Sequence, residues 1–271
     1  IDVDADSTIN GVTVGLGGGS IVENTAVGTD ALSKNTEGRF NTAVGRGALG
    51  SNTTFGSNTA VGANALLSHT VGGSNTAVGS SALKANTEGV ENTAVGKSAL
   101  ANNTTGSQNV AVGHNALAEG RTGNYNTALG QQALLYTYAG SGNIGIGGVT
   151  SDGEFSPVFL ASTEDNRIVM GSTSITNAYV QVAWTVTSDA RDKTNFAPVP
   201  HGLDFVKQLQ PTQYEFRVDR DSEEVNGPIH YGFKAQDILA LEGDNPVIID
   251  TENPDHLKYK GEHLVPVLVN A

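Results

Sequence analysis

A serine and a lysine five residues apart, Ser188 and Lys193, are residue types that could do chemistry together in this 271-residue chain. A serine hydroxyl is a poor nucleophile until a base takes its proton, and a lysine amine shielded from water can be that base. A short turn closes this separation, and the Ser188 Oγ could then attack the carbonyl before it through a five-membered ring. Taken alone, such a pair is more often two surface polar residues than a catalytic pair. The sequence around it must show which of the two applies.

A strict repeat occupies much of the chain before this pair. The word Asn-Thr-Ala-Val-Gly, or a close variant, recurs with a constant 17-residue period. Its leading asparagines are Asn24, Asn41, Asn58, Asn75, Asn92, Asn109, Asn126 and Asn143. An Ala-Leu pair follows in seven of the eight units, and a second Asn-Thr step lies mid-unit in four, with His69-Thr70 as a near match in another. Such a fixed period indicates stacked structural units.

Each unit holds two short apolar runs, Ala-Val and Ala-Leu, bounded by Asn, Gly or Thr. Such runs between turn formers predict two short strands per unit, and the frequent glycines disfavour helices. One unit is then one coil of a β-solenoid, with a Val, a Leu and two Ala facing inwards. We expect stacked asparagines to pass amide hydrogen bonds along a column, and the recurrent glycine to supply a positive φ at a corner.

The apolar content of one coil is small, because ordering each residue of the backbone costs about 1–2 kcal/mol. We therefore expect neighbouring chains to cover the small Ala and Gly faces, with three chains side by side or wound together. The predicted fold class is mainly β: a trimeric parallel β-solenoid or β-prism, followed by an α+β domain. The handedness of the coil stays open.

Changes of pattern divide the chain into four expected segments. These are an N-terminal cap or link at 1–23, the repeat shaft at 24–150, a β-rich trimeric stem or tip at 151–187, and a mixed α+β domain at 188–271. In the third segment, Tyr179–Trp184 alternates like a strand. In the last, we expect helices over 202–210 and 235–243, a strand over 212–218, and an apolar helix within 263–271.

Composition excludes several classes of function. The chain has no cysteine, so it forms no disulfide or cysteine-based metal site, and we expect no cofactor or metal. No apolar run approaches the length of about 18 residues that a membrane-spanning helix needs, so membrane insertion is not expected. The net charge is −13 and no basic stripe is present, which argues against nucleic-acid binding. The chain opens at Ile1 without a signal peptide, and we expect it to be a piece of something longer.

Several blocks of the last segment carry a family resemblance. They are Ser188-Asp189, Lys193, Leu209-Gln210-Pro211 and His230-Tyr231-Gly232-Phe233-Lys234-Ala235-Gln236. In this order they resemble the self-cleaving intramolecular chaperone domain of the endosialidase type, found at the C-termini of phage tailspikes and tail fibres. The resemblance covers about residues 188–271, and the longer C-terminal helix usual in the family is cut short here. The repeats are more weakly similar to the heads of trimeric autotransporter adhesins.

The resemblance implies roles for individual residues. Ser188 would be the nucleophile, Lys193 the base, and His230 an orienting or oxyanion partner. Cleavage would fall at the junction of Thr187, Ser188 and Asp189, with the bond on either side of Ser188 left open, although Asp189 could be only a turn former. At most this is a single-turnover Ser-Lys autoprotease. No pair of carboxylates suited to sugar cleavage stands out on the repeat, so depolymerase activity is not expected.

These observations predict a homotrimeric host-attachment fibre of a bacteriophage tail, made in the host cytoplasm and carried on the virion. Its expected partners are the rest of the fibre on the N-terminal side and a host cell-surface receptor, most simply a glycan. One alternative is the head of a bacterial trimeric surface adhesin. Another is an ice-binding solenoid, suggested by the column of threonines that follow the leading asparagines, although Val110 interrupts that column.

Overall fold

The chain divides into two compact units, residues 1–175 and 176–271. The computed structural model describes residues 7–9, 12–149, 153, 155, 157, 161–172, 174–175, 190–217, 223–244, 246–251, 254 and 257–271. The strand predicted at Tyr179–Trp184 lies outside these residues. Each unit is described by itself below.

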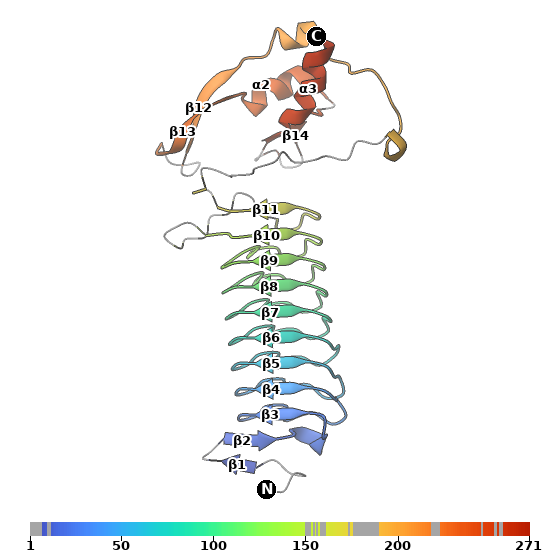
Figure 1. Ribbon diagram of the computed structural model, residues 1–271, viewed down its shortest axis with the longest axis vertical. Coiled ribbons are helices and arrows are strands. Elements are labelled where there is room, and N and C mark those ends of the chain that lie inside the picture. Colours follow the sequence, from blue (N-terminus) through green and yellow to red (C-terminus); the bar gives the residue numbers. More distant parts are fainter. Residues whose placement is uncertain are drawn as a thin grey trace. The chain divides into compact units, whose positions relative to one another are not determined.

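The first unit is built around a column of short parallel strands, stacked one above the next (Figure 1). The strands are β3 (Thr25–Val27), β4 (Thr42–Val44), β5 (Thr59–Val61), β6 (Thr76–Val78), β7 (Thr93–Val95), β8 (Val110–Val112), β9 (Thr127–Leu129), β10 (Ile144–Ile146) and β11 (Ile168–Met170). From β3 to β10, equivalent residues of successive coils pair in register. The predicted parallel β-solenoid of 17-residue repeats is therefore confirmed.

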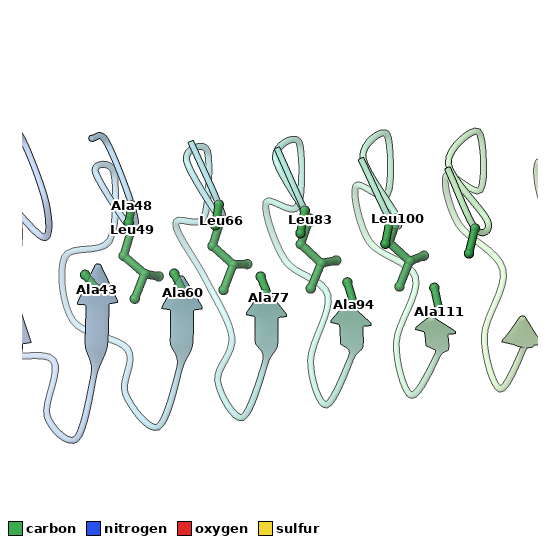
Figure 2. Close-up of a cluster of buried hydrophobic side chains, with 14 of the residues drawn as sticks. Ala43, Ala48, Leu49, Ala60, Leu66, Ala77, Leu83, Ala94, Leu100 and Ala111 are labelled. Atoms are coloured by element: carbon green, nitrogen blue, oxygen red, sulfur yellow. The ribbon is translucent and has the colours of Figure 1, made fainter. Parts of the chain in front are cut away.

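The interior of the solenoid contains alanine and leucine, and the valines lie outside it. In each strand from β3 to β9 the central alanine is buried, whereas its two neighbours point outwards, because successive strand residues face opposite sides. Figure 2 shows Leu66 and Leu83 reaching from the far side of the coil towards the strand alanines Ala60 and Ala77. The predictions that Val faces inwards and that neighbouring chains cover the alanines are wrong, since each coil buries its own alanines.

The second apolar run of each repeat forms a turn, which corrects the prediction of two strands per coil. The leucines of the Ala-Leu pairs adopt left-handed backbone conformations with φ between 49° and 51°. In this conformation the leucine side chain enters the coil while its backbone N–H donates to the next coil, as Leu83 N–H does to the Ala99 carbonyl at 3.0 Å. One strand and a series of turns therefore complete each coil.

The leading asparagines form the predicted column of hydrogen bonds inside the solenoid. Asn92 is representative: its backbone N–H donates to Asn75 Oδ1 at 3.0 Å, and its own Oδ1 accepts from the Asn109 N–H at 3.0 Å. Its Nδ2 donates to the Gly106 carbonyl of the same coil at 2.8 Å. Each buried amide thus joins neighbouring coils, and all except that of Asn58, which donates to the Gly56 carbonyl, also donate across the coil. The asparagine is therefore needed at every turn.

A second buried column, formed by the mid-unit asparagines, is interrupted at His69. The imidazole donates from Nε2 to the Gly72 carbonyl at 2.8 Å and accepts at Nδ1 from Asn86 Nδ2 at 3.1 Å. Both contacts fit the neutral Nε2–H tautomer, which has no second N–H to donate. Among the described residues, the buried Asn52 Oδ1 consequently has no hydrogen-bond partner, whereas Asn86 Oδ1 receives a bond from Asn103 at 2.7 Å.

Replacing His69 by asparagine is expected to raise the free energy of unfolding by about 1–2 kcal/mol, because the new amide can donate to Asn52 Oδ1. Burial lowers the pKa of the His69 imidazole below its usual value of 6.5, although its hydrogen bond to the Gly72 carbonyl acts in the opposite direction. Wild-type stability should therefore be full above about pH 6.5 and fall as the pH drops below it, because the unfolded chain takes up the proton more readily.

Thermal melts of wild type and His69→Asn at about pH 7.5 and about pH 5.5 measure both effects. The variant should melt higher at each pH and should lose less stability on acidification. Equal melting temperatures with the same acid sensitivity would show that the interruption of the column at His69 does not affect stability.

The sheet of stacked strands extends beyond the sequence repeat at both ends. β11 pairs in register with β10 although it lies 24 residues further on, and the Arg167 N–H takes the place of an asparagine N–H by donating to Asn143 Oδ1 at 2.8 Å. At the other end, β1 (Ser7–Ile9) and β2 (Val12–Gly15) form an antiparallel hairpin that pairs with β3. A 3-10 turn, η1 (Gly18–Ser20), follows this hairpin.

The second unit is a small α+β region, as predicted. It contains η2 (Ala190–Asp192), α1 (Leu203–Val206), β12 (Thr212–Arg217), β13 (Val225–Gly232), α2 (Ala235–Glu242), β14 (Ile249–Asp250), β15 (Lys258–Tyr259) and α3 (Gly261–Asn270). The strand and helices predicted in this unit are present, although α1 covers only Leu203–Val206 of the helix predicted at 202–210, and α2 ends at Gly243 with φ 71°. Its core consists of Phe205, Ile238, Ile248, Ile249, Leu264 and Val267.

Candidate functional site

The structure describes Lys193 and His230 of the predicted site but not its cleavage junction. Thr187, Ser188 and Asp189 lie outside the described residues, so their roles stay predictions. Lys193 follows the 3-10 turn η2, where its backbone N–H donates to the Ala190 carbonyl at 3.3 Å and its side chain is exposed. Lys193 is thus an exposed residue within a single chain, and the shielding from water that a lysine base requires would have to come from elsewhere.

His230 lies on the long hairpin of β12 and β13, directly opposite Tyr214 in the strand register. Its half-buried ring stacks on Tyr214 with centroids 5.6 Å apart, and the edge of Phe216 meets it at 5.2 Å. Tyr214 and Phe216 also contact each other edge to face at 5.3 Å. This aromatic cluster holds the imidazole in place. Such packing is compatible both with a role in orienting the reacting groups and with a purely structural role.

The two aromatic neighbours of His230 were not predicted as part of a site. They lie in the predicted strand at 212–218 and are two residues apart, so a shared face could be expected from the alternation alone. Their contact with His230 depends on the pairing of β12 with β13, which shifts register between Tyr214 and Phe216. No local sequence signal marks such a shift.

A groove of about 540 Å³ lies elsewhere in this unit, between the segment at 195–201, the end of α2 and helix α3. The Glu242 carboxylate beside it accepts hydrogen bonds from the backbone N–H groups of Val247, Ile248 and Ile249 at 2.7–2.9 Å. These bonds anchor the loop after α2, so the carboxylate has a structural role. The same unit stacks His201 on Phe205, with ring centroids 4.3 Å apart.

The described residues contain no group of three or more His, Cys, Asp or Glu side chains placed to hold a metal ion. Nor does any helix in the described part of the chain have the length and apolar character needed to cross a membrane.

A parallel β-solenoid followed by a small α+β unit defines a repeat protein with a distinct C-terminal unit. Residues 188–245 match the sequence model of a family described as the chaperone of endosialidase. This match includes the Ser188-Asp189 junction, Lys193 and His230, and it is consistent with a phage fibre that carries a C-terminal chaperone domain. Searches of curated proteins and of solved structures returned no match.

Proposed function

We propose that this chain is a segment of a homotrimeric bacteriophage tail fibre that attaches the virion to a host cell-surface receptor, most simply a glycan. In this proposal 1–23 is a cap or link to the rest of the fibre, 24–150 the shaft, 151–187 a trimeric stem or tip, and 188–271 the assembly chaperone. The observation that carries it is a regular β-solenoid in the same chain as residues matching the endosialidase chaperone family.

The same proposal includes one round of self-cleavage at Ser188. The Ser188 Oγ attacks the Thr187 carbonyl while Lys193 accepts its proton, and the departing Ser188 nitrogen takes a proton, which leaves an ester between the two residues. Water then hydrolyses the ester and separates shaft from chaperone. His230, held by Tyr214, orients the reacting groups. The exposure of Lys193 in one chain suggests that assembly supplies the shielding its amine needs.

Ser188→Ala is expected to leave trimer assembly intact and to abolish cleavage, because alanine has no nucleophilic oxygen. Wild type should release over time an N-terminal fragment that ends at Thr187. Denaturing gels and intact mass measurements of both proteins follow the fragment, and native mass measurement follows assembly. A fragment of that size from both proteins would exclude Ser188 as the nucleophile.

A further inference from the structure

One outward face of the solenoid carries an unbroken apolar row. The third residue of every strand from β3 to β11 points away from the coil interior. These residues are Val27, Val44, Val61, Val78, Val95, Val112, Leu129, Ile146 and Met170. None is polar, although all are at least partly exposed, and the exposed fraction reaches 36% at Val95 and 50% at Met170.

The neighbouring outward column shows that strand formation alone does not explain this row. The first residue of each strand is also outward, and in six of the nine strands it is threonine, which favours strands as well as valine does. Leu129 and Met170 lack the branched Cβ that suits strands, yet they keep the row apolar. Towards β11 the first column also becomes apolar, at Val110, Ile144 and Ile168, so the apolar face widens.

Parallel sheets are nearly always covered on both faces, and a contiguous exposed apolar patch marks a contact surface. The coil interior covers one face of this sheet, and the apolar row lies on the other. A matching partner must present apolar groups at the same spacing of about 4.8 Å along the same length. A second copy of this chain has that spacing by construction. Neither outward column contains a charged residue, so like faces meet without repulsion.

We propose that this row is the surface on which the copies of the chain pack, so that three rows lie along the common axis of the trimer. The inference rests on the proposed trimeric fibre and adds to it the face that is buried. Parallel packing brings residue 95 of each copy to the same level on the axis. The turns and corners of the coil, which carry the charged side chains, then face solvent.

Val95 and Val71 provide a matched pair of variants. In one chain their exposures are similar, 36% and 45%, but Val95 lies in the row and Val71 lies at a bend of the coil. Val95→Asp should abolish the trimer in sedimentation or native mass measurements, because it places three carboxylates at the axis. Val71→Asp should remain trimeric with a melting temperature close to that of wild type. A Val95→Asp trimer that melts like wild type would overturn the inference.

Cysteine cross-linking tests the same face without disturbing folding. The chain has no cysteine, so Val95→Cys and Val71→Cys each introduce a single thiol. A short bismaleimide should link copies of Val95→Cys and leave Val71→Cys unlinked. The reverse pattern, or no link at residue 95 in a proven trimer, would overturn the assignment of the face. A folded wild-type monomer would instead refute the proposed trimeric fibre itself, so the two failures are distinguishable.

Discussion

Replacing Gly79 by valine is expected to lower the free energy of unfolding by roughly 3 kcal/mol or more, which corresponds to a fall in melting temperature of about 6–12 °C. Gly79 follows strand β6 directly and has φ 135°, a region that β-branched residues avoid. A Cβ built there would also lie 2.5 Å from the Gly96 carbonyl oxygen and 2.6 Å from its carbon. Those atoms belong to the backbone of the next coil and cannot move aside alone.

The control is Ser80→Val, one residue further along the same coil. Ser80 is exposed and does not have a positive φ, so the same side chain there should change the melting temperature little. Gly79→Ala should fall near the valine variant, because alanine keeps the contact with Gly96 although it lacks the branch. Circular dichroism melts of the three variants measure these differences. Indistinguishable melting temperatures for Gly79→Val and Ser80→Val would contradict the role assigned to this corner.

A chain ending at Thr187 is expected to yield little or no soluble trimer, in contrast to the full chain. The apolar core of each coil is only two alanines and one leucine, and each strand must pair with the equivalent strand of the next repeat rather than with a near neighbour in the sequence. In the proposed function the chaperone unit gathers three chains first and so lowers the entropic barrier to starting the solenoid. Expression of both chains, followed by native mass measurement of the soluble fraction, tests this expectation.

The same shaft released after assembly should behave differently. If a protease recognition sequence is placed before Ser188 and cut in the folded trimer, the shaft should stay trimeric, because unfolding is slow once the coils have stacked. A chain ending at Thr187 that forms the same trimer unaided would show that the C-terminal unit is not needed for assembly. Dissociation at once after the cut would show that it is needed permanently rather than as a chaperone.

The period of the repeat was enough to predict the stacked coil, the asparagine column and the corner glycine, because each depends only on identical residues lying above one another. The direction of the side chains was harder to predict. Hydrophobicity alone predicts that Val78 lies inside the coil. A three-residue strand, however, places Thr76 and Val78 on one face and Ala77 on the other, and it is Ala77 that is buried. The narrow interior accepts alanine, and this constraint appears only when the coil is closed.

Two other features had no adequate sequence signal. Strand β11 was not predicted as a further coil because it lies 24 residues after β10 instead of 17. Arg167 occupies the position of the leading asparagine, and only Gly171, four residues later, matches the repeat. At the candidate site, the motif pointed to His230, but its aromatic neighbours depend on an irregular register in the hairpin. Such a register is decided by packing across the hairpin rather than by the residues of one strand.

The uniform junction between coils has a consequence for the history of the molecule. Since the strands from β3 to β10 pair in the same register at every junction, gaining or losing one whole unit preserves that register, whereas a single-residue insertion would shift it and break the column of leading asparagines. Variants of this chain that differ in length by whole coils are therefore compatible with the same stacking. The hairpin at one end and β11 at the other would be inherited intact, and length could evolve independently of either end.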